Sequence, residues 1–251
     1  MVNIFIGYDP KEISAYHVLS HSLIWRATEP LSITPLARSH LQDIYQRPRG
    51  PLESTDFSLT RFLVPYLSGY RGFSLYLDCD MLCRTDIVEL LDRPLDTKSV
   101  WVCPHDYTPK DERKMDDQIQ TQYPRKNWSS MMLFNNSKCW ALTPEYVNQA
   151  PALDLHRFAW AQDSEIGHVP LEWNWLVGEY EANPGAKMLH YTLGGPWLPD
   201  YRKGDHVFDW VYEYQAMLGY DPWPMTLSNT TSWEETPGGH AAALQLRRGT
   251  S

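Results

Sequence analysis

The chain has 251 residues, enough for one α/β domain with a full core or at most two small domains. Hydrophobic residues make up 43% of the sequence, which is typical of a folded globular protein and excludes a disordered chain. The net charge of −9 argues against binding to bare nucleic acid, which requires a basic face. An acidic protein can still bind a diphosphate when a divalent cation lies between the carboxylates and the phosphates.

In chain order, the first 140 residues alternate apolar, strand-like runs with helix-like segments. Strands are predicted over residues 2–7, 31–36, 73–77, 99–103 and 130–135. Helices are predicted over residues 12–25, 57–67 and 87–91. Residues 42–55 are predicted to form a loop, and 108–125 a charged excursion on the surface. This alternation favours a mostly parallel sheet with helices on both faces.

The rest of the chain is less regular. Helices are predicted over residues 144–150 and 155–161, and from residue 170 onward the chain alternates Trp, Gly and Pro. We expect a long irregular segment there, with one helix near 208–217. There is no internal repeat and no linker, so we expect a single domain over residues 1–228 and a loosely ordered tail over 229–251.

The cysteines and the N-terminal residues bear on the cellular compartment. The four cysteines show neither a C-x-x-C pair nor zinc spacing, which indicates reduced thiols; they are Cys79, Cys83, Cys103 and Cys139. The apolar run at the start is too short for a signal peptide and has no basic leader. No stretch reaches the ~18 apolar residues of a membrane span. We therefore expect a cytoplasmic protein without a transmembrane segment.

Two aspartates, Asp78 and Asp80, directly follow the apolar run 73–77. In open α/β sheets, ligands bind at the carboxyl ends of the strands. Carboxylates at positions i and i+2 of an extended strand point to the same side and can hold Mg²⁺ or Mn²⁺ while a diphosphate and water complete the shell. A D-x-D tripeptide is also common as a solvated turn, so the motif alone leaves both interpretations open.

Several short motifs occur in a characteristic order along the chain. They are T-R-F-L-V-P-Y-L with Arg61, S-L-Y-L-D-C-D-M-L, T-D-I-V-E-L, F-N-N from Phe134, Gln162-Asp163 followed by P-L-E-W-N, and His190 followed by Gly194 and P-W. Together they resemble the nucleotide-sugar-dependent glycosyltransferases of the GT-A fold, and most of all glycosyltransferase family 8, the glycogenin-like and galactosyltransferase-like group. The matches span residues 4–197, about three quarters of the chain. The resemblance implies an α/β, Rossmann-like, mostly parallel sheet flanked by helices.

The resemblance also implies an activity. It implies transfer of a hexose, with retention of anomeric configuration, from a nucleotide-sugar to an acceptor that the sequence does not name. The expected donor is a UDP-sugar, and the expected cofactor is Mn²⁺ (or Mg²⁺) held by Asp78, Asp80 and His190. A neutral imidazole is a good ligand for such an ion, which would offset charge on the leaving diphosphate.

Further donor-binding residues follow from the resemblance. They are Gly7, Tyr8, Asp9, Arg61, Asp78, Cys79, Asp80, Asn135 and Gly194. Tyr8 would stack on the base, and Asp9 would accept a hydrogen from the base or ribose. Two alternatives stay open: a plain turn at residues 7–9, and an arginine at position 61 that pairs with Asp56 or Glu53.

The sequence departs from the family at its C-terminal motif. Gly195 stands where the family has a phosphate-binding Lys, and the spacing from His190 to Gly194 is one residue longer. Lys203, Lys126 and Arg125 are the nearest cations in the sequence that could replace that Lys. We assign Lys126 and Asn127, in the mixed polar and aromatic segment 123–130, to contact with the donor sugar or phosphate; a basic surface loop is the alternative.

Asp163 is the expected catalytic carboxylate because it matches the family's D-Q segment. It would act as a transient nucleophile or hold sugar hydroxyls.

Two other functions remain open. A nucleotidyltransferase would also place metal-binding carboxylates at strand ends, but the loop after the first strand lacks the Gly-rich basic segment of that class. A non-catalytic carbohydrate-binding protein on the same scaffold could use the Trp-rich stretch 160–197.

Overall fold

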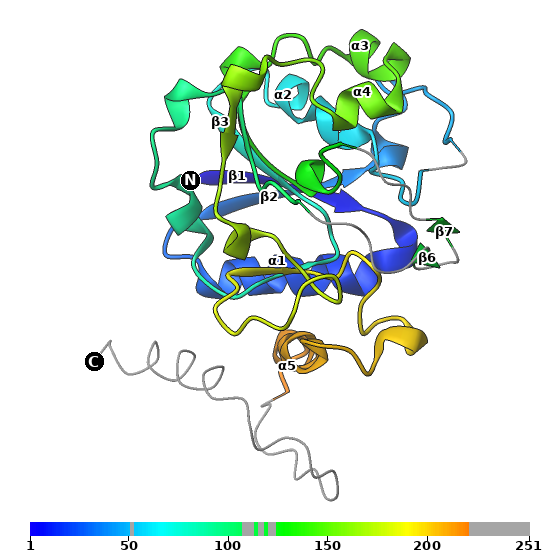
Figure 1. Ribbon diagram of the computed structural model, residues 1–251, viewed down its shortest axis with the longest axis vertical. Coiled ribbons are helices and arrows are strands. Elements are labelled where there is room, and N and C mark those ends of the chain that lie inside the picture. Colours follow the sequence, from blue (N-terminus) through cyan, green and yellow to red (C-terminus); the bar gives the residue numbers. More distant parts are fainter. Residues whose placement is uncertain (51–52, 107–112, 115–117, 120–123, 221–251) are drawn as a thin grey trace, which may run out of the picture.

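A six-stranded sheet organises the computed structural model, which describes residues 1–50, 53–106, 113–114, 118–119 and 124–220 (Figure 1). Its strand order is β2-β1-β3-β8-β5-β9. The strands are β1 (Val2–Tyr8), β2 (Leu31–Ala37), β3 (Phe73–Leu77), β5 (Val100–Val102), β8 (Met131–Asn135) and β9 (Ile166–His168). Strand β8 runs antiparallel to its neighbours β3 and β5, whereas the other pairs are parallel. The prediction of a mostly parallel sheet is confirmed.

Helices cover both faces of this sheet, as expected (Figure 1). The α-helices are α1 (Ile13–Arg26), α2 (Val64–Leu67), α3 (Pro144–Gln149), α4 (Ala152–His156) and α5 (Val207–Met217). In Figure 1, α1 lies below the sheet and α2, α3 and α4 lie above it. Helix α1 presents fully buried Leu19 and Leu23, one helical turn apart, to the core. Helix α5 packs on the far side of α1, where Arg26 and His21 of α1 pair with buried Glu213 of α5.

A second, small sheet brings distant parts of the chain together. It consists of β10 (Trp175–Leu176), β11 (Met188–His190) and β4 (Met81–Cys83), in the order β10-β11-β4. Strand β4 begins right after Asp80, and β11 runs antiparallel to it with His190 opposite Met81. A backbone bond from Tyr191 N to Asp80 O (2.9 Å) extends this pairing. The small sheet therefore places the end of β11 beside the D-x-D turn.

Short 3₁₀ helices fill many of the connections. They are Pro10–Glu12, Arg38–His40, Thr60–Leu63, Ile87–Leu91, Leu95–Thr97, Trp128–Ser130, Asn136–Lys138, Asp163–Glu165, Leu171–Trp173 and Pro199–Tyr201. A two-stranded ladder pairs β6 (Arg113–Lys114) with β7 (Gln118–Ile119). Among the described helices, none combines the length and the apolar character needed to cross a membrane.

All five predicted strands are present, and so are the helices predicted near residues 12–25, 144–150 and 208–217. The predicted helix 57–67 is shorter and starts as a 3₁₀ turn. The prediction 155–161 is wrong: α4 begins after Pro151, and Phe158 adopts a left-handed conformation with φ 62° that ends helical structure. The proposed tail 229–251 and most of the excursion 108–125 lie outside the described residues.

Candidate active site

Asp78, Asp80 and His190 converge on one point at the carboxyl edge of the main sheet. Each offers one ligand atom, and these atoms lie within 4.8 Å of one another. All three residues are buried, with 9%, 6% and 2% of the residue surface exposed. His190 Nε2 is 3.3 Å from Asp80 Oδ1. These residues meet because β3 ends at Leu77, just before Asp78, and β11 ends at His190 beside the start of β4.

Arg61 and Tyr76 hold Asp78 in place. Arg61 Nη1 lies 2.9 Å from Asp78 Oδ1 and also donates to Ser129 O (2.9 Å), and Tyr76 Oη donates to Asp78 Oδ1 (2.7 Å). Burial raises the pKa of Asp78, and the Arg61 guanidinium opposes that shift. Arg61 pairs with Asp78, and Asp56 pairs with Arg49. The alternative in which Arg61 pairs with Asp56 or Glu53 therefore does not hold.

A chain of hydrogen bonds fixes the tautomer of His190. Ser130 Oγ donates its only hydrogen to Asn127 O (2.6 Å), so it accepts from Asn174 Nδ2 (2.9 Å). Asn174 Oδ1 then faces His190 Nδ1 at 2.9 Å and accepts its hydrogen. In the neutral form of His190 the lone pair therefore lies on Nε2, the nitrogen beside Asp80.

The residues present fit a divalent cation. Two carboxylate groups and an imidazole nitrogen with an available lone pair form a mixed oxygen and nitrogen donor set. Of the two carboxylates, Asp78 is the one that pairs with Arg61. An ion such as Mn²⁺ or Mg²⁺ between the three side chains would balance the remaining buried negative charge.

Glu12 is a further buried acid that the sequence analysis missed. It is 4% exposed, and its Oε2 accepts a weak hydrogen bond from Cys79 Sγ (3.6 Å). Burial, together with the charges of Asp80 and Asp9, raises its pKa to about 8. Glu12 is therefore protonated at neutral pH. It contacts the D-x-D turn through Cys79. Its position at the start of a helical run gave no signal in the sequence.

His105 follows β5, which is separated from β3 by β8 in the main sheet. Its Nδ1 lies 2.9 Å from Tyr180 Oη, and its carbonyl accepts from Trp128 Nε1 (3.3 Å). Burial, reinforced by the nearby His190, lowers its pKa to about 3. This imidazole is neutral at any physiological pH and adds no charge to the site.

Hydrogen bonds to the Asp9 carboxylate hold the loop after β1 in place. Asp9 is buried and accepts from Lys11 N (2.9 Å) and Asp56 N (3.0 Å). A Cβ on Gly7 would come within 2.4 Å of the Phe57 ring, so the close packing at this position requires glycine. Tyr8 is half-buried and meets Tyr16 edge-to-face, with ring centroids 5.3 Å apart.

The 124–130 loop lies on the same edge as the D-x-D turn. Lys126 and Asn127 are half-buried, and Asn127 adopts a left-handed conformation with φ 63° that turns its carbonyl toward Ser130. Gly194 occupies the turn after β11 with φ 135°, a conformation that favours glycine. Cys79 is fully buried with its thiol toward Glu12.

Asn135 and Asp163 lie apart from the Asp78, Asp80 and His190 cluster. Asn135 ends the antiparallel strand β8, opposite Phe73, whereas Leu77 pairs with Met131. It therefore lies roughly 13 Å along the sheet from the D-x-D end, at about 3.3 Å per residue, and its expected donor contact is wrong. The side chain of Asp163, before β9, is 83% exposed and pairs with Arg125 (2.6 Å) rather than with the cluster.

A curated protein from Arabidopsis thaliana called Protein CDI is 45% identical to this chain over 221 residues, covering 84% of the chain and 85% of the relative. The chain belongs to the Protein CDI family. No protein-family model matches it.

Solved structures identify the fold of this member of the Protein CDI family. LgtC, solved in complex with donor and acceptor sugar analogs, matches 89% of the chain and 98% of its own length, with a TM-score of 0.54 and 12% identity. The bifunctional glycosyltransferase WbbM matches with a TM-score of 0.60 and 17% identity, covering 85% of the chain but only 49% of WbbM. GlyE of Streptococcus pneumoniae TIGR4 matches with a TM-score of 0.56 and 14% identity, covering 87% of the chain and 63% of GlyE. The chain has the GT-A fold.

Proposed function

We propose that this protein is a metal-dependent glycosyltransferase that moves a hexose from a nucleotide-sugar, a UDP-hexose, to an acceptor, with retention of anomeric configuration. The observation that carries the proposal is the convergence of Asp78, Asp80 and His190 within 4.8 Å at the carboxyl edge of a GT-A sheet. The fold of LgtC, which was solved with sugar analogs bound, supports it. Retention follows from the sequence resemblance to family 8.

Asp78, Asp80 and His190 would hold Mn²⁺ or Mg²⁺, which when bound would neutralise charge on the departing diphosphate. Arg61 and Tyr76 orient the Asp78 carboxylate, and Asn174 presents the Nε2 lone pair of His190. These supporting residues come from separate elements and are buried or nearly so, so the donor atoms are preorganised.

Residues around the cluster would bind the rest of the donor. We propose that Tyr8 contacts the nucleoside, that Gly194 lets the backbone approach the phosphates, and that Lys126 and Asn127 contact the sugar or phosphate. Asp163 is tied through Arg125 to the same loop as Lys126. We therefore propose that Asp163 holds sugar hydroxyls rather than acting as a nucleophile, and that the departing phosphate takes the acceptor proton.

A thermal-shift panel of nucleotide-sugars with and without MnCl₂ tests donor binding. A ligand that binds only the folded state stabilises it by about 2.7 kcal/mol at a ligand concentration of a hundred times the Kd. This stabilisation raises the melting temperature. We expect a Mn²⁺-dependent shift with one UDP-sugar. Asp80→Asn should abolish it, and Asp200→Asn, at an exposed aspartate, should preserve it. No shift with any nucleotide would refute the donor site.

Catalysis needs a separate assay. Metal-dependent hydrolysis of UDP-glucose or UDP-galactose distinguishes an enzyme from a non-catalytic sugar-binding protein. The reaction is monitored through the release of UDP. Proton NMR of the released sugar within the first turnovers, before mutarotation, should show the anomer of the donor. An inverted product would contradict retention while leaving the metal site intact.

A further inference from the structure

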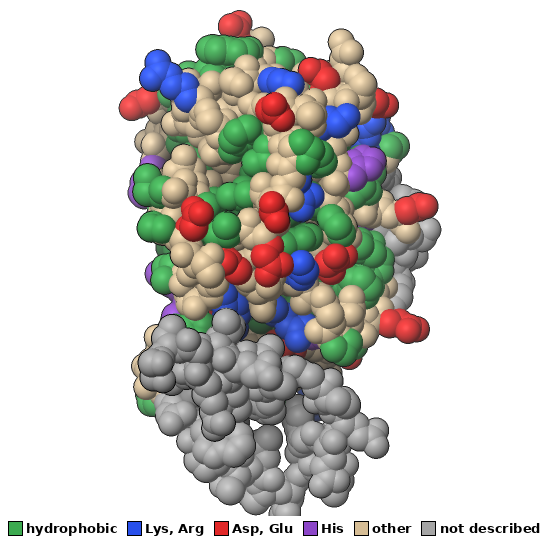
Figure 2. All heavy atoms as spheres, turned by 90° about the vertical axis from the view of Figure 1, so that its left-hand side faces the viewer, with side chains coloured by type: hydrophobic (Ala, Val, Ile, Leu, Met, Phe, Trp, Pro, Cys, Tyr) green, Lys and Arg blue, Asp and Glu red, His purple; other side chains and the backbone are tan. Residues whose placement is uncertain are grey.

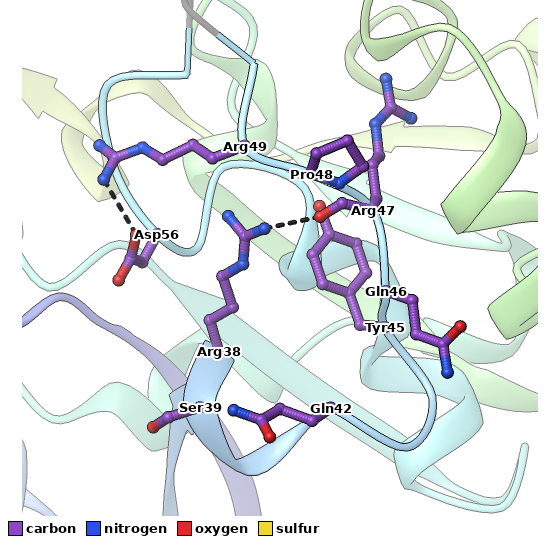
Figure 3. A pocket seen from close by; sticks show the side chains of 9 residues that line it. All are labelled: Arg38, Ser39, Gln42, Tyr45, Gln46, Arg47, Pro48, Arg49 and Asp56. Carbon is purple, nitrogen blue, oxygen red and sulfur yellow. Dashed lines mark hydrogen bonds and ion pairs between the residues drawn. The ribbon is translucent and has the colours of Figure 1, made fainter.

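A pocket of about 480 Å³ opens beside the active site, at the carboxyl end of β2 (Figure 3). Strand β2 ends at Ala37, opposite Tyr8 of β1, and the pocket begins with the next residue, Arg38. Since β1 lies between β2 and β3 and neighbouring strands are about 4.8 Å apart, the end of β2 lies about 10 Å from the D-x-D end. The pocket is therefore next to the metal cluster but not part of it.

Arg38 supplies the central cation of this pocket. Its guanidinium extends into the space between Arg49 and Tyr45 (Figure 3) and lies over the Tyr45 ring, 5.4 Å from its centroid. Its Nη2 donates to Arg47 O (2.6 Å). Within the described part of the chain this is the one hydrogen bond of the Arg38 side chain, although a guanidinium carries five N–H donors. Its other N–H donors make no further hydrogen bond to the described residues, and Arg38 lines the pocket.

Arg49 forms the opposite wall and is held rigidly. Its three nitrogens donate to Glu53 O (3.2 Å), Ser54 O (2.9 Å) and Asp56 Oδ1 (3.0 Å). A guanidinium anchored in this way keeps its fork geometry without an ordering cost when a ligand arrives. Asp56 offsets the charge of Arg49, so the charge of Arg38 remains for a ligand.

Arg47 contributes charge but not contact. Its guanidinium turns away from the pocket (Figure 3) and donates to the carbonyls of Val147 and Ala150, in and just after α3. The neutral amide of Gln42 lies on the rim and offers further hydrogen bonds. The pocket thus has a net positive charge in a protein whose overall charge is −9.

We propose that this pocket binds the phosphate group of a small phosphorylated molecule, separately from the donor's diphosphate. Arginine forks match the oxygens of a phosphate in pairs, which a point charge does not. The volume lies within the roughly 300–1,000 Å³ of small-molecule sites, so a phosphate bonded to Arg38 and Arg49 leaves room for a hydroxyl-rich body at the Gln42 rim. The Asp56 N–H bond to Asp9 links this pocket to the loop of the donor site.

Isothermal titration with inorganic phosphate tests the pocket without any nucleotide. We expect saturable binding that Arg38→Gln weakens at least tenfold and Arg38→Lys weakens less, because a lysine keeps the charge but loses the fork. Arg71→Gln removes an exposed arginine elsewhere and should leave the Kd unchanged. Arg49→Gln, checked by its melting temperature, gives a second test from the opposite wall.

A competition arm separates this pocket from the donor site. Phosphate should still bind at saturating UDP and Mn²⁺, and in Asp80→Asn. Displacement by UDP would overturn the proposal, since the pocket would then belong to the nucleotide. No phosphate binding, or an unchanged Kd in Arg38→Gln, would also overturn it. Binding of phosphate without binding of any nucleotide would contradict the proposed transferase function but support the proposal for this pocket.

Discussion

Replacing Glu12 with Gln should stabilise the protein against unfolding, and increasingly so as the pH rises from 5 to 7. The folded-state pKa is raised from 4.5 to about 8, chiefly by burial. Between these values the unfolded carboxyl is ionised while the folded one keeps its proton, so wild-type stability falls with rising pH. The fall is about 1.36 kcal/mol per pH unit, or about 2.7 kcal/mol from pH 5 to 7. Above pH 8 both states are ionised and the fall levels off.

Thermal melting of wild type and Glu12→Gln without metal, from pH 5 to 8.5, measures this effect. The gap in melting temperature should widen by roughly 5 to 10 °C between pH 5 and 7, from about 2–4 °C per kcal/mol for a protein of this size. The half-buried Glu172 provides a control, because Glu172→Gln should leave the gap flat. A constant gap across this pH range would refute the argument that burial keeps Glu12 protonated.

Two further substitutions probe the support of the site. Asn174→Ala removes the acceptor that fixes the His190 tautomer, so Mn²⁺ affinity measured by titration calorimetry should fall by about 10- to 100-fold, and an unchanged affinity would contradict the tautomer argument. Gly7→Ala places a Cβ 2.4 Å from the buried Phe57 ring and should destabilise the fold by about 1 to 3 kcal/mol in urea unfolding, whereas Gly204→Ala, with open space around it, should not; equal effects would exclude close packing as the cause.

Five of the six strands of the main sheet were predictable from the sequence because apolar runs mark them, and the D-x-D followed because it comes directly after one of these runs. The sixth strand, β9, has only three residues and was missed. The small sheet was not predictable in this way. Strands β4, β10 and β11 have two or three residues each, too few to show a period. His190 was found through resemblance, since only the register of β11 on β4 brings it to Asp80.

The errors share a physical origin in strand direction and burial. Asn135 was assigned to the donor site from the resemblance of its F-N motif to the family, but β8 is antiparallel and its carboxyl end lies at the opposite edge of the sheet. Glu12 was overlooked because burial, not local sequence, gives it its properties. Both are set by contacts between residues more than 60 positions apart, such as Phe73 with Asn135 and Glu12 with Cys79.

The charges around the D-x-D turn fit a site that a bound cation would complete. Arg61, anchored on the carbonyls of Phe57 and Ser129, compensates Asp78 with a fixed positive charge. Asp80 faces the imidazole of His190 instead, whose Nδ1 lies against Asn174 Oδ1 and whose Nε2 lies 3.3 Å from Asp80 Oδ1. A second arginine there would satisfy Asp80 and block the metal. The position beside Asp80 and His190 Nε2 is therefore one that a divalent ion would fill.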